Sequence, residues 1–136
     1  MSNTARIATL ETAGCLVRAY DHPSLGRVLE VVLSGRQDPD FWEGVRRLLR
    51  EEIARQSPQY LVFDLRTLDC IVGSSFLGGL VAGGIEMERQ GRLGRTRIVA
   101  IGGMAGRLAE VLTLCKLEPV LGGIHPDLAS ALADLR

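Results

Sequence analysis

Residues 60–84 read YLVFDLRTLDCIVGSSFLGGLVAGG, and this stretch decides the class of fold. Tyr60 to Leu65 is a short apolar run with no polar residue until Asp64, which is typical of a strand covered on both faces. A helix is predicted to follow from about Ser75 to Gln90. Because a buried strand followed by a helix is the unit from which parallel sheets are built, we expect residues 60–65 to lie centrally in a sheet.

Strand and helix signals alternate on both sides of this stretch. Pro23–Gly26 is a turn signal between two apolar runs, which predicts a hairpin, and Asp38 and Pro39 are typical of the start of a helix that ends at Pro58. The other predicted strands are 14–20, 27–33, 96–101 and a short one at 120–124. A third helix is predicted to place Leu108, Val111, Leu112 and Cys115 on one face. A last helix at 127–135 is predicted to turn Leu128, Leu132 and Leu135 inward.

This order of elements predicts an α/β fold with a mixed sheet, in which helical crossovers make the later strands parallel. We expect the helices to cover chiefly one face. The opposite face is expected to be partly open or shielded by the N-terminal segment.

The composition describes one globular domain and excludes several classes of partner. The chain has 136 residues, 46% of them hydrophobic, and its sixteen basic and sixteen acidic side chains cancel, so neither nucleic acid nor an anionic membrane is favoured as a partner. Cys15, Cys70 and Cys115 lie far apart in apolar stretches, as reduced core thiols do, which favours the cytoplasm. We expect no signal peptide and no membrane span.

The predicted helix at 75–90 contains more glycine than its propensity would favour. Its four glycines give up about 3 kcal/mol relative to alanine, so some contact must offset the loss. The helical spacing places Leu77, Leu80, Val81, Gly84 and Ile85 toward the core and Gly79, Gly83, Glu86 and Gln90 away from it, with Phe76 and Met87 beside the outer strip. The outer glycines would then form a shallow docking groove, although they are equally compatible with tolerated positions in a helix held by its neighbours.

Ser74 and Ser75 stand at the start of this helix. Serine is among the preferred N-cap residues, because its hydroxyl accepts a hydrogen bond from a free amide of the first turn. The same free amides and the helix dipole also favour a phosphate, so a phosphorylated hydroxyl here would add negative charge to a docking surface without disrupting the fold.

No catalytic or metal-binding set stands out. His22 and His125 are isolated from paired Cys or acidic residues, and neither lies in a segment that would bring it to Ser74. Gly102–Gly106 lacks the Lys-Ser/Thr of a P-loop and is interpreted as a tight strand-to-helix turn. The arginines after the second helix, which are Arg89, Arg92, Arg95 and Arg97, indicate a solvated rim that would help to meet an acidic partner. We therefore expect neither an enzyme nor a cofactor.

Three stretches resemble the STAS domain of anti-sigma-factor antagonists. They are Gly35-Arg36-Gln37-Asp38 before the first helix, Leu61-Val62-Phe63-Asp64-Leu65 as the central strand, and Ser74-Ser75-Phe76-Leu77-Gly78 at the start of the second helix. The resemblance covers roughly residues 14–135 and depends mainly on the order and spacing of these motifs. It implies a single STAS-like domain at 14–136, with residues 1–13 as an N-terminal extension or edge strand. It also implies a four- or five-stranded mixed sheet with helices mainly on one face.

The resemblance implies a function by partner switching. In the family the unmodified protein binds a serine kinase of histidine-kinase-like ATPase type that doubles as the anti-sigma factor, and phosphorylation of a serine releases it. That serine matches Ser74, with Ser75 as the alternative. The implied partner-binding residues are Gly73, Ser74, Ser75, Phe76, Gly79, Gly83, Glu86 and Met87, and the implied state is a cytoplasmic monomer or weak homodimer.

The sequence departs from the family pattern in two ways. Gly73 stands where the family has an aspartate. The spacing from Asp64 to Ser74 is one residue longer than in the family, so an insertion between Thr67 and Gly73 has to be assumed. The missing acid favours a second hypothesis, a constitutive STAS interaction module of a scaffold or transporter, in which the serines only cap the helix.

Overall fold

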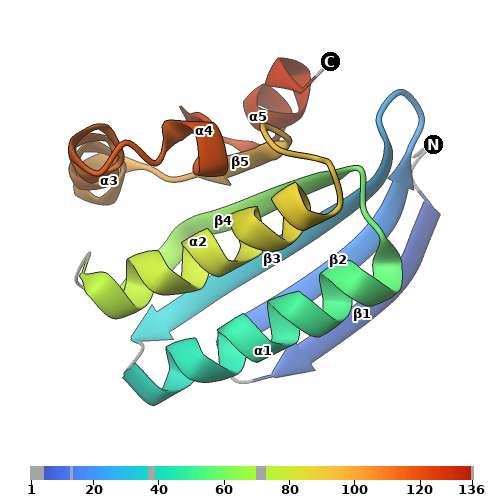
Figure 1. The fold of residues 1–136 in the computed structure, drawn as a ribbon, viewed down its shortest axis with the longest axis horizontal. Coiled ribbons are helices and arrows are strands. Elements are labelled where there is room, and N and C mark those ends of the chain that lie inside the picture. The colour runs from blue at the N-terminus through green and yellow to red at the C-terminus, as the bar shows by residue number, and fades with distance from the viewer. Residues whose placement is uncertain (1–4, 13, 37–38, 70–72, 136) are drawn as a thin grey trace.

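The computed structural model describes residues 5–12, 14–36, 39–69 and 73–135. Within them, six strands form one sheet in chain order (Figure 1). The strands are β1 (Ala5–Thr12), β2 (Cys15–His22), β3 (Gly26–Arg36), β4 (Tyr60–Asp69), β5 (Thr96–Val99) and β6 (Ile124–His125). β1, β2 and β3 pair antiparallel, whereas β3, β4, β5 and β6 pair parallel. The predicted class, an α/β fold with a mixed sheet, is confirmed, with β1 as an additional strand at the edge.

Helices cover the two faces of this sheet unequally. The helices of the described chain are α1 (Pro39–Gln56), α2 (Ser74–Arg89), α3 (Gly102–Leu114), α4 (Glu118–Leu121) and α5 (Leu128–Asp134). α1 and α2 lie side by side across one face (Figure 1). α5 packs on the opposite face through Ala131 and Leu135. The helices therefore lie mainly on one face, as predicted. α5 shields part of the other face, whereas β1, the described part of the N-terminal segment, is an edge strand of the sheet.

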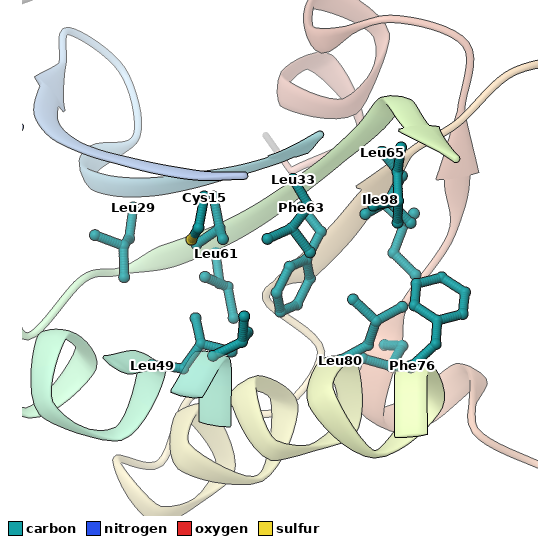
Figure 2. Packing of buried hydrophobic residues seen from close by; sticks show 14 of the residues in the cluster. Cys15, Leu29, Leu33, Leu49, Leu61, Phe63, Leu65, Phe76, Leu80 and Ile98 are labelled. Carbon is teal, nitrogen blue, oxygen red and sulfur yellow. The ribbon is translucent and has the colours of Figure 1, made fainter. Parts of the chain in front are cut away.

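Alternating side chains of the central strands separate two apolar clusters. Leu61 and Phe63 of β4 lie in the main core beneath α1 and α2 (Figure 2). Val62 and Val99 belong to the smaller cluster under α5. Because successive side chains of a strand point to opposite faces, β4 is buried on both sides, as its unbroken apolar run predicted.

The C-terminal part of the chain corrects one predicted element. Val120 lies in the helix α4, and the last strand comprises Ile124 and His125 instead of residues 120–124. Pro119 suits the first turn of a short helix, and Gly122 ends that helix with a φ of 67°. The apolar run alone did not distinguish a buried helical turn from a strand.

The cysteines differ in their surroundings. Cys15 is buried, and burial raises the pKa of its thiol to about 11. Cys115 is exposed at the C-terminal end of α3, so its predicted place in the core is wrong, whereas Leu108 and Leu112 of that helix are buried as expected. Cys70 lies outside the described residues, as does the predicted N-cap Asp38.

Glycines let α2 lie close to its neighbours. A Cβ on Gly79 would lie 2.6 Å from Cε3 of Trp42 in α1, and a Cβ on Gly83 would lie 2.7 Å from Cζ of Phe63 in β4. Real Cβ atoms essentially never come this close to another heavy atom, so two aromatic rings occupy the space where side chains would stand. The burial of Trp42 and Phe63 against the helix backbone offsets the helix propensity that these glycines lose.

We expect Gly79→Ala and Gly83→Ala to lower the free energy of unfolding by about 1–3 kcal/mol each, because overpacking exceeds the gain in helix propensity. Gly106→Ala is the matched control, since a Cβ there meets nothing within 4 Å, and it should stabilise the protein by about 0.5–1 kcal/mol. Urea denaturation measures all three. Stabilisation by alanine at position 79 or 83 would contradict the close packing.

A cluster of charged side chains lies on the sheet face opposite α1 and α2. The carboxylate of Glu30 accepts a hydrogen bond from Arg18 at 2.8 Å and one from the Tyr20 hydroxyl at 3.4 Å. Asp64 pairs with Arg66, at 2.7 Å between Oδ2 and Nη2. Burial raises the pKa of Glu30, and the Arg18 guanidinium opposes this rise.

The raised pKa of Glu30 predicts a pH dependence of stability. The folded state holds this proton more tightly than the unfolded state, so the contribution of Glu30 to the free energy of unfolding falls as the pH rises above its ordinary pKa of 4.5. The stability of the wild type minus that of Glu30→Gln should therefore decrease from pH 4.5 toward neutrality in urea denaturation. Glu110→Gln, which changes an exposed glutamate of α3, is the control. An increase over the same range would contradict the assignment.

Candidate partner-binding site

The parallel strands β3 and β4 end at the edge of the sheet where α2 begins. Gly35 pairs with Leu68 at this edge, whereas the pairing of β5 with β4 stops at Asp64. The last five residues of β4, Leu65 to Asp69, therefore extend past β5. In open α/β sheets, binding sites form outside the carboxyl ends of parallel strands, so the start of α2 is placed where a site is expected.

Ser74 is the first residue of α2 and is exposed, while Ser75 is half-buried. The N-cap is Gly73, whose backbone is extended (φ −130°, ψ −173°), and its carbonyl accepts a hydrogen bond from the amide of Leu77 at 3.0 Å. Among the described residues, no side chain caps this end of the helix. The prediction that a serine is the N-cap is therefore wrong, because Gly73 already takes the extended conformation and both serines stand inside the first turn.

The spacing between Asp64 and Ser74 contains a β-bulge. Val32 pairs with Asp64 and Ser34 pairs with Thr67, so β4 has one more residue than β3 in this interval. This extra residue lies before the Thr67–Gly73 loop, in which the comparison of spacings predicted an insertion. Residues 70–72 of that loop lie outside the described part of the chain.

The predicted docking groove on the outer side of α2 is not present. Gly79 and Gly83 face inward, against α1 and β4, and Phe76 and Met87 are 1% and 0% exposed. Ile85, predicted to face the core, is 38% exposed, whereas the core position of Leu80 is confirmed. Half of the residues assigned to partner binding are therefore part of the core.

The rotation of the helix has a physical cause. α2 packs against the sheet, against α1 and against α4, and a Cβ on Gly84 would lie 2.5 Å from Cγ1 of Val120 in α4. The prediction from helical spacing took large apolar side chains as the mark of the buried face. In α2 glycines contribute to that face as well, and the rings of Trp42 and Phe76, with centroids 5.2 Å apart, pack together at its beginning.

Asp64 does not replace the acid that is missing before Ser74. Its carboxylate lies on the sheet face opposite α2, where Arg66 donates hydrogen bonds of 3.0 and 2.7 Å to its two oxygens. Its neighbour Phe63 points into the core beneath α2, which fixes Asp64 on the other side. The carboxylate of Asp64 therefore does not face the hydroxyl of Ser74.

The other polar constellations are structural. His22 Nδ1 accepts a hydrogen bond from the Ser24 amide at 3.1 Å, and His125 Nε2 lies 3.1 Å from the carboxylate of Asp134. Among the described residues, no group of three or more His, Cys, Asp or Glu is arranged to hold a metal ion. None of the described helices is both long and apolar enough to cross a membrane. Gly102–Gly106, predicted to be a tight strand-to-helix turn, forms the first five residues of α3, and a Cβ on Gly102, Gly103 or Gly106 meets nothing within 4 Å.

The predicted arginine rim after α2 is mostly occupied by bonds within the protein. Arg92 donates to the Pro58 carbonyl, Arg95 to the Gln59 side chain, Arg97 to Asp134 and Arg89 to Glu86, at 2.7, 2.8, 2.7 and 2.6 Å. The sequence analysis missed Arg46 and Arg50 on the exposed side of α1, which line a groove together with Arg89. Two arginines four residues apart on the polar face of an amphipathic helix were the signal for it.

Because no serine caps α2, we expect Ser74→Ala to change the free energy of unfolding by less than about 0.5 kcal/mol. Ser74→Asp should stabilise by about 0.3–1 kcal/mol through the helix dipole. Asp127→Ala is the matched control, since Asp127 caps α5 by accepting from the Ser130 amide at 2.8 Å, and its loss should cost about 1 kcal/mol. Thermal and urea unfolding measure the three; a loss at Ser74→Ala equal to that of the control would contradict the assignment.

Comparison with known proteins bears on this arrangement. No family model and no curated protein matches the chain. The structure of the Bacillus cell fate determinant SpoIIAA in the phosphorylated form is similar, with a TM-score of 0.60 over 80% of this chain and 91% of that chain, at 17% sequence identity. At this identity the likeness concerns the fold. Together with the mixed sheet and its helices, it shows that the chain has the STAS fold.

Proposed function

We propose that this protein is an anti-sigma-factor antagonist that acts by partner switching in the cytoplasm. In the unmodified state it binds a serine kinase of histidine-kinase-like ATPase type that doubles as the anti-sigma factor, and phosphorylation of Ser74 releases that kinase. One observation carries the proposal. Ser74 is exposed at the first residue of α2, in a fold similar to that of a protein whose structure is of the phosphorylated form.

The first turn of α2 is suited to a phosphate. The amides at the start of a helix have no partner within the helix, and its dipole favours negative charge there. A phosphate at Ser74 adds about 1.5 to 2 negative charges without breaking a side-chain cap, since the described residues provide none. Ser75 is half-buried and is therefore less accessible to a kinase, which supports Ser74 as the acceptor.

Gly73 supports a second candidate function. A glycine at the N-cap provides no carboxylate to orient the Ser74 hydroxyl. Under this alternative the chain is a constitutive interaction module that binds its partner in one state, and Ser74 is only a residue of the first turn.

Incubation of the protein with its cognate kinase and ATP, followed by mass spectrometry, tests the proposal. We expect one phosphate on the peptide that contains Ser74, its loss in Ser74→Ala, and its retention in Ser75→Ala as the matched control. Ser74→Asp should weaken kinase binding at least about tenfold, measured by calorimetry, because the added charge is repelled from the interface.

The two candidates give opposite results in this experiment. An unmodified Ser74, with the same kinase affinity in Ser74→Asp as in the wild type, would reject partner switching and support the constitutive module. Phosphate on Ser75 alone, retained in Ser74→Ala, would reject the assignment of the acceptor.

A further inference from the structure

The helices α1 and α2 enclose a groove on their outer surface. Its volume is about 170 Å³, and it is lined by Arg46, Arg50, Ala82, Ile85, Glu86 and Arg89. The apolar part is contributed by Ala82 and the partly exposed Ile85, both of α2. The charged part comes from both helices, which lie close together where a Cβ on Gly79 would come within 2.6 Å of Cε3 of Trp42.

The groove has an excess of positive charge. Its three arginines face a single carboxylate, that of Glu86, which accepts from Arg89 at 2.6 Å and lies 3.9 Å from Arg50. Arg46 makes no ion pair with any residue in the described part of the chain. The side chains of Arg50 and Arg89 are 68% and 66% exposed, so their guanidinium groups are accessible to a partner. The chain as a whole is neutral, which makes this local excess a specific feature of the groove.

We infer that this arginine groove binds an acidic segment of the protein partner, an inference that rests on the proposed function. Guanidinium groups bind carboxylates through paired, charge-assisted hydrogen bonds, and Arg46 and Arg50, one helical turn apart, match successive acidic side chains. The apolar floor at Ala82 and Ile85 accepts the aliphatic stems of the same segment. Complementary charge of this kind accelerates association and selects the partner.

The groove begins next to the serines. The guanidinium of Arg46 occupies the position of a side chain at residue 78, since a Cβ on Gly78 would overlap its Nη2. Residue 78 is the neighbour of Ser74 and Ser75 on the helix surface, four and three residues on. A phosphate on Ser74 would thus lie beside Arg46, where it competes for this guanidinium and repels an acidic segment.

Charge reversal tests the groove. We expect Arg46→Glu combined with Arg50→Glu to weaken kinase binding at least about tenfold at about 50 mM salt, and to flatten the salt dependence of the affinity up to about 300 mM. The matched control combines Arg107→Glu with Lys116→Glu, which changes the net charge equally at exposed positions of α3 and just after it and should alter the affinity less than about twofold. Circular dichroism verifies folding, and Arg46→Ala with Arg50→Ala provides a milder version of the same test.

The outcomes separate this inference from the proposed function. If the kinase phosphorylates Ser74 but binds the Arg46→Glu/Arg50→Glu variant as tightly as the Arg107→Glu/Lys116→Glu control, the role of the groove in binding is overturned and the proposed function stands. If no kinase binds or phosphorylates the protein, a titration of ¹⁵N-labelled protein with a polyglutamate peptide decides about the groove alone. Chemical-shift changes of the Gly78, Ala82 and Ile85 amides in the wild type that disappear in the Arg46→Glu/Arg50→Glu variant support the inference. It is overturned if the wild type shows no such changes, or if the Arg46→Glu/Arg50→Glu variant shows the same changes as the wild type.

Discussion

The contact between the backbone of α2 and the rings of Trp42 and Phe63 is the constraint on which the rest of the structure depends. Gly79 and Gly83 leave room for these two rings, so α2 approaches both α1 and β4 at a distance that no larger residue allows. Three consequences follow from this approach. The main core is closed between helices and sheet, the start of α2 is fixed at the carboxyl edge of β4, and the outer sides of α1 and α2 form a common surface.

Much of the fold was predictable because hydrophobic periodicity reports burial directly. The apolar run of β4 and the amphipathic pattern of α1 both gave the correct element, and their order gave the α/β class. The errors fall where the pattern carries no such information. Residues 120–124 form an apolar run too short to distinguish helix from strand, and the orientation of α2 depends on glycines, whose hydropathy does not show that they are buried.

The candidate site was predictable in part for the same reason. The position of Ser74 at the beginning of a helix followed from its place after the central strand and is found in the structure. The sequence could not show that Ser74 is not the cap, because the neighbouring Gly73 can adopt the N-cap conformation as well. Arg46 and Arg50 were overlooked because they belong to α1, and only the packing of α1 beside α2 brings them into one groove with Ala82, Ile85 and Glu86.

The close packing of α2 limits how the proposed phosphorylation of Ser74 would act on the rest of the domain. A helix that touches rigid rings on its inner side, with no slack between them, has one resting position, and interiors packed to this density do not slide by fractions of an ångström without repacking. A phosphate on Ser74, the first residue of α2, would therefore not shift the helix to a second packed position. The proposed phosphate would then act locally, as a change of electrostatic potential at the surface, while the rest of the domain would keep its structure.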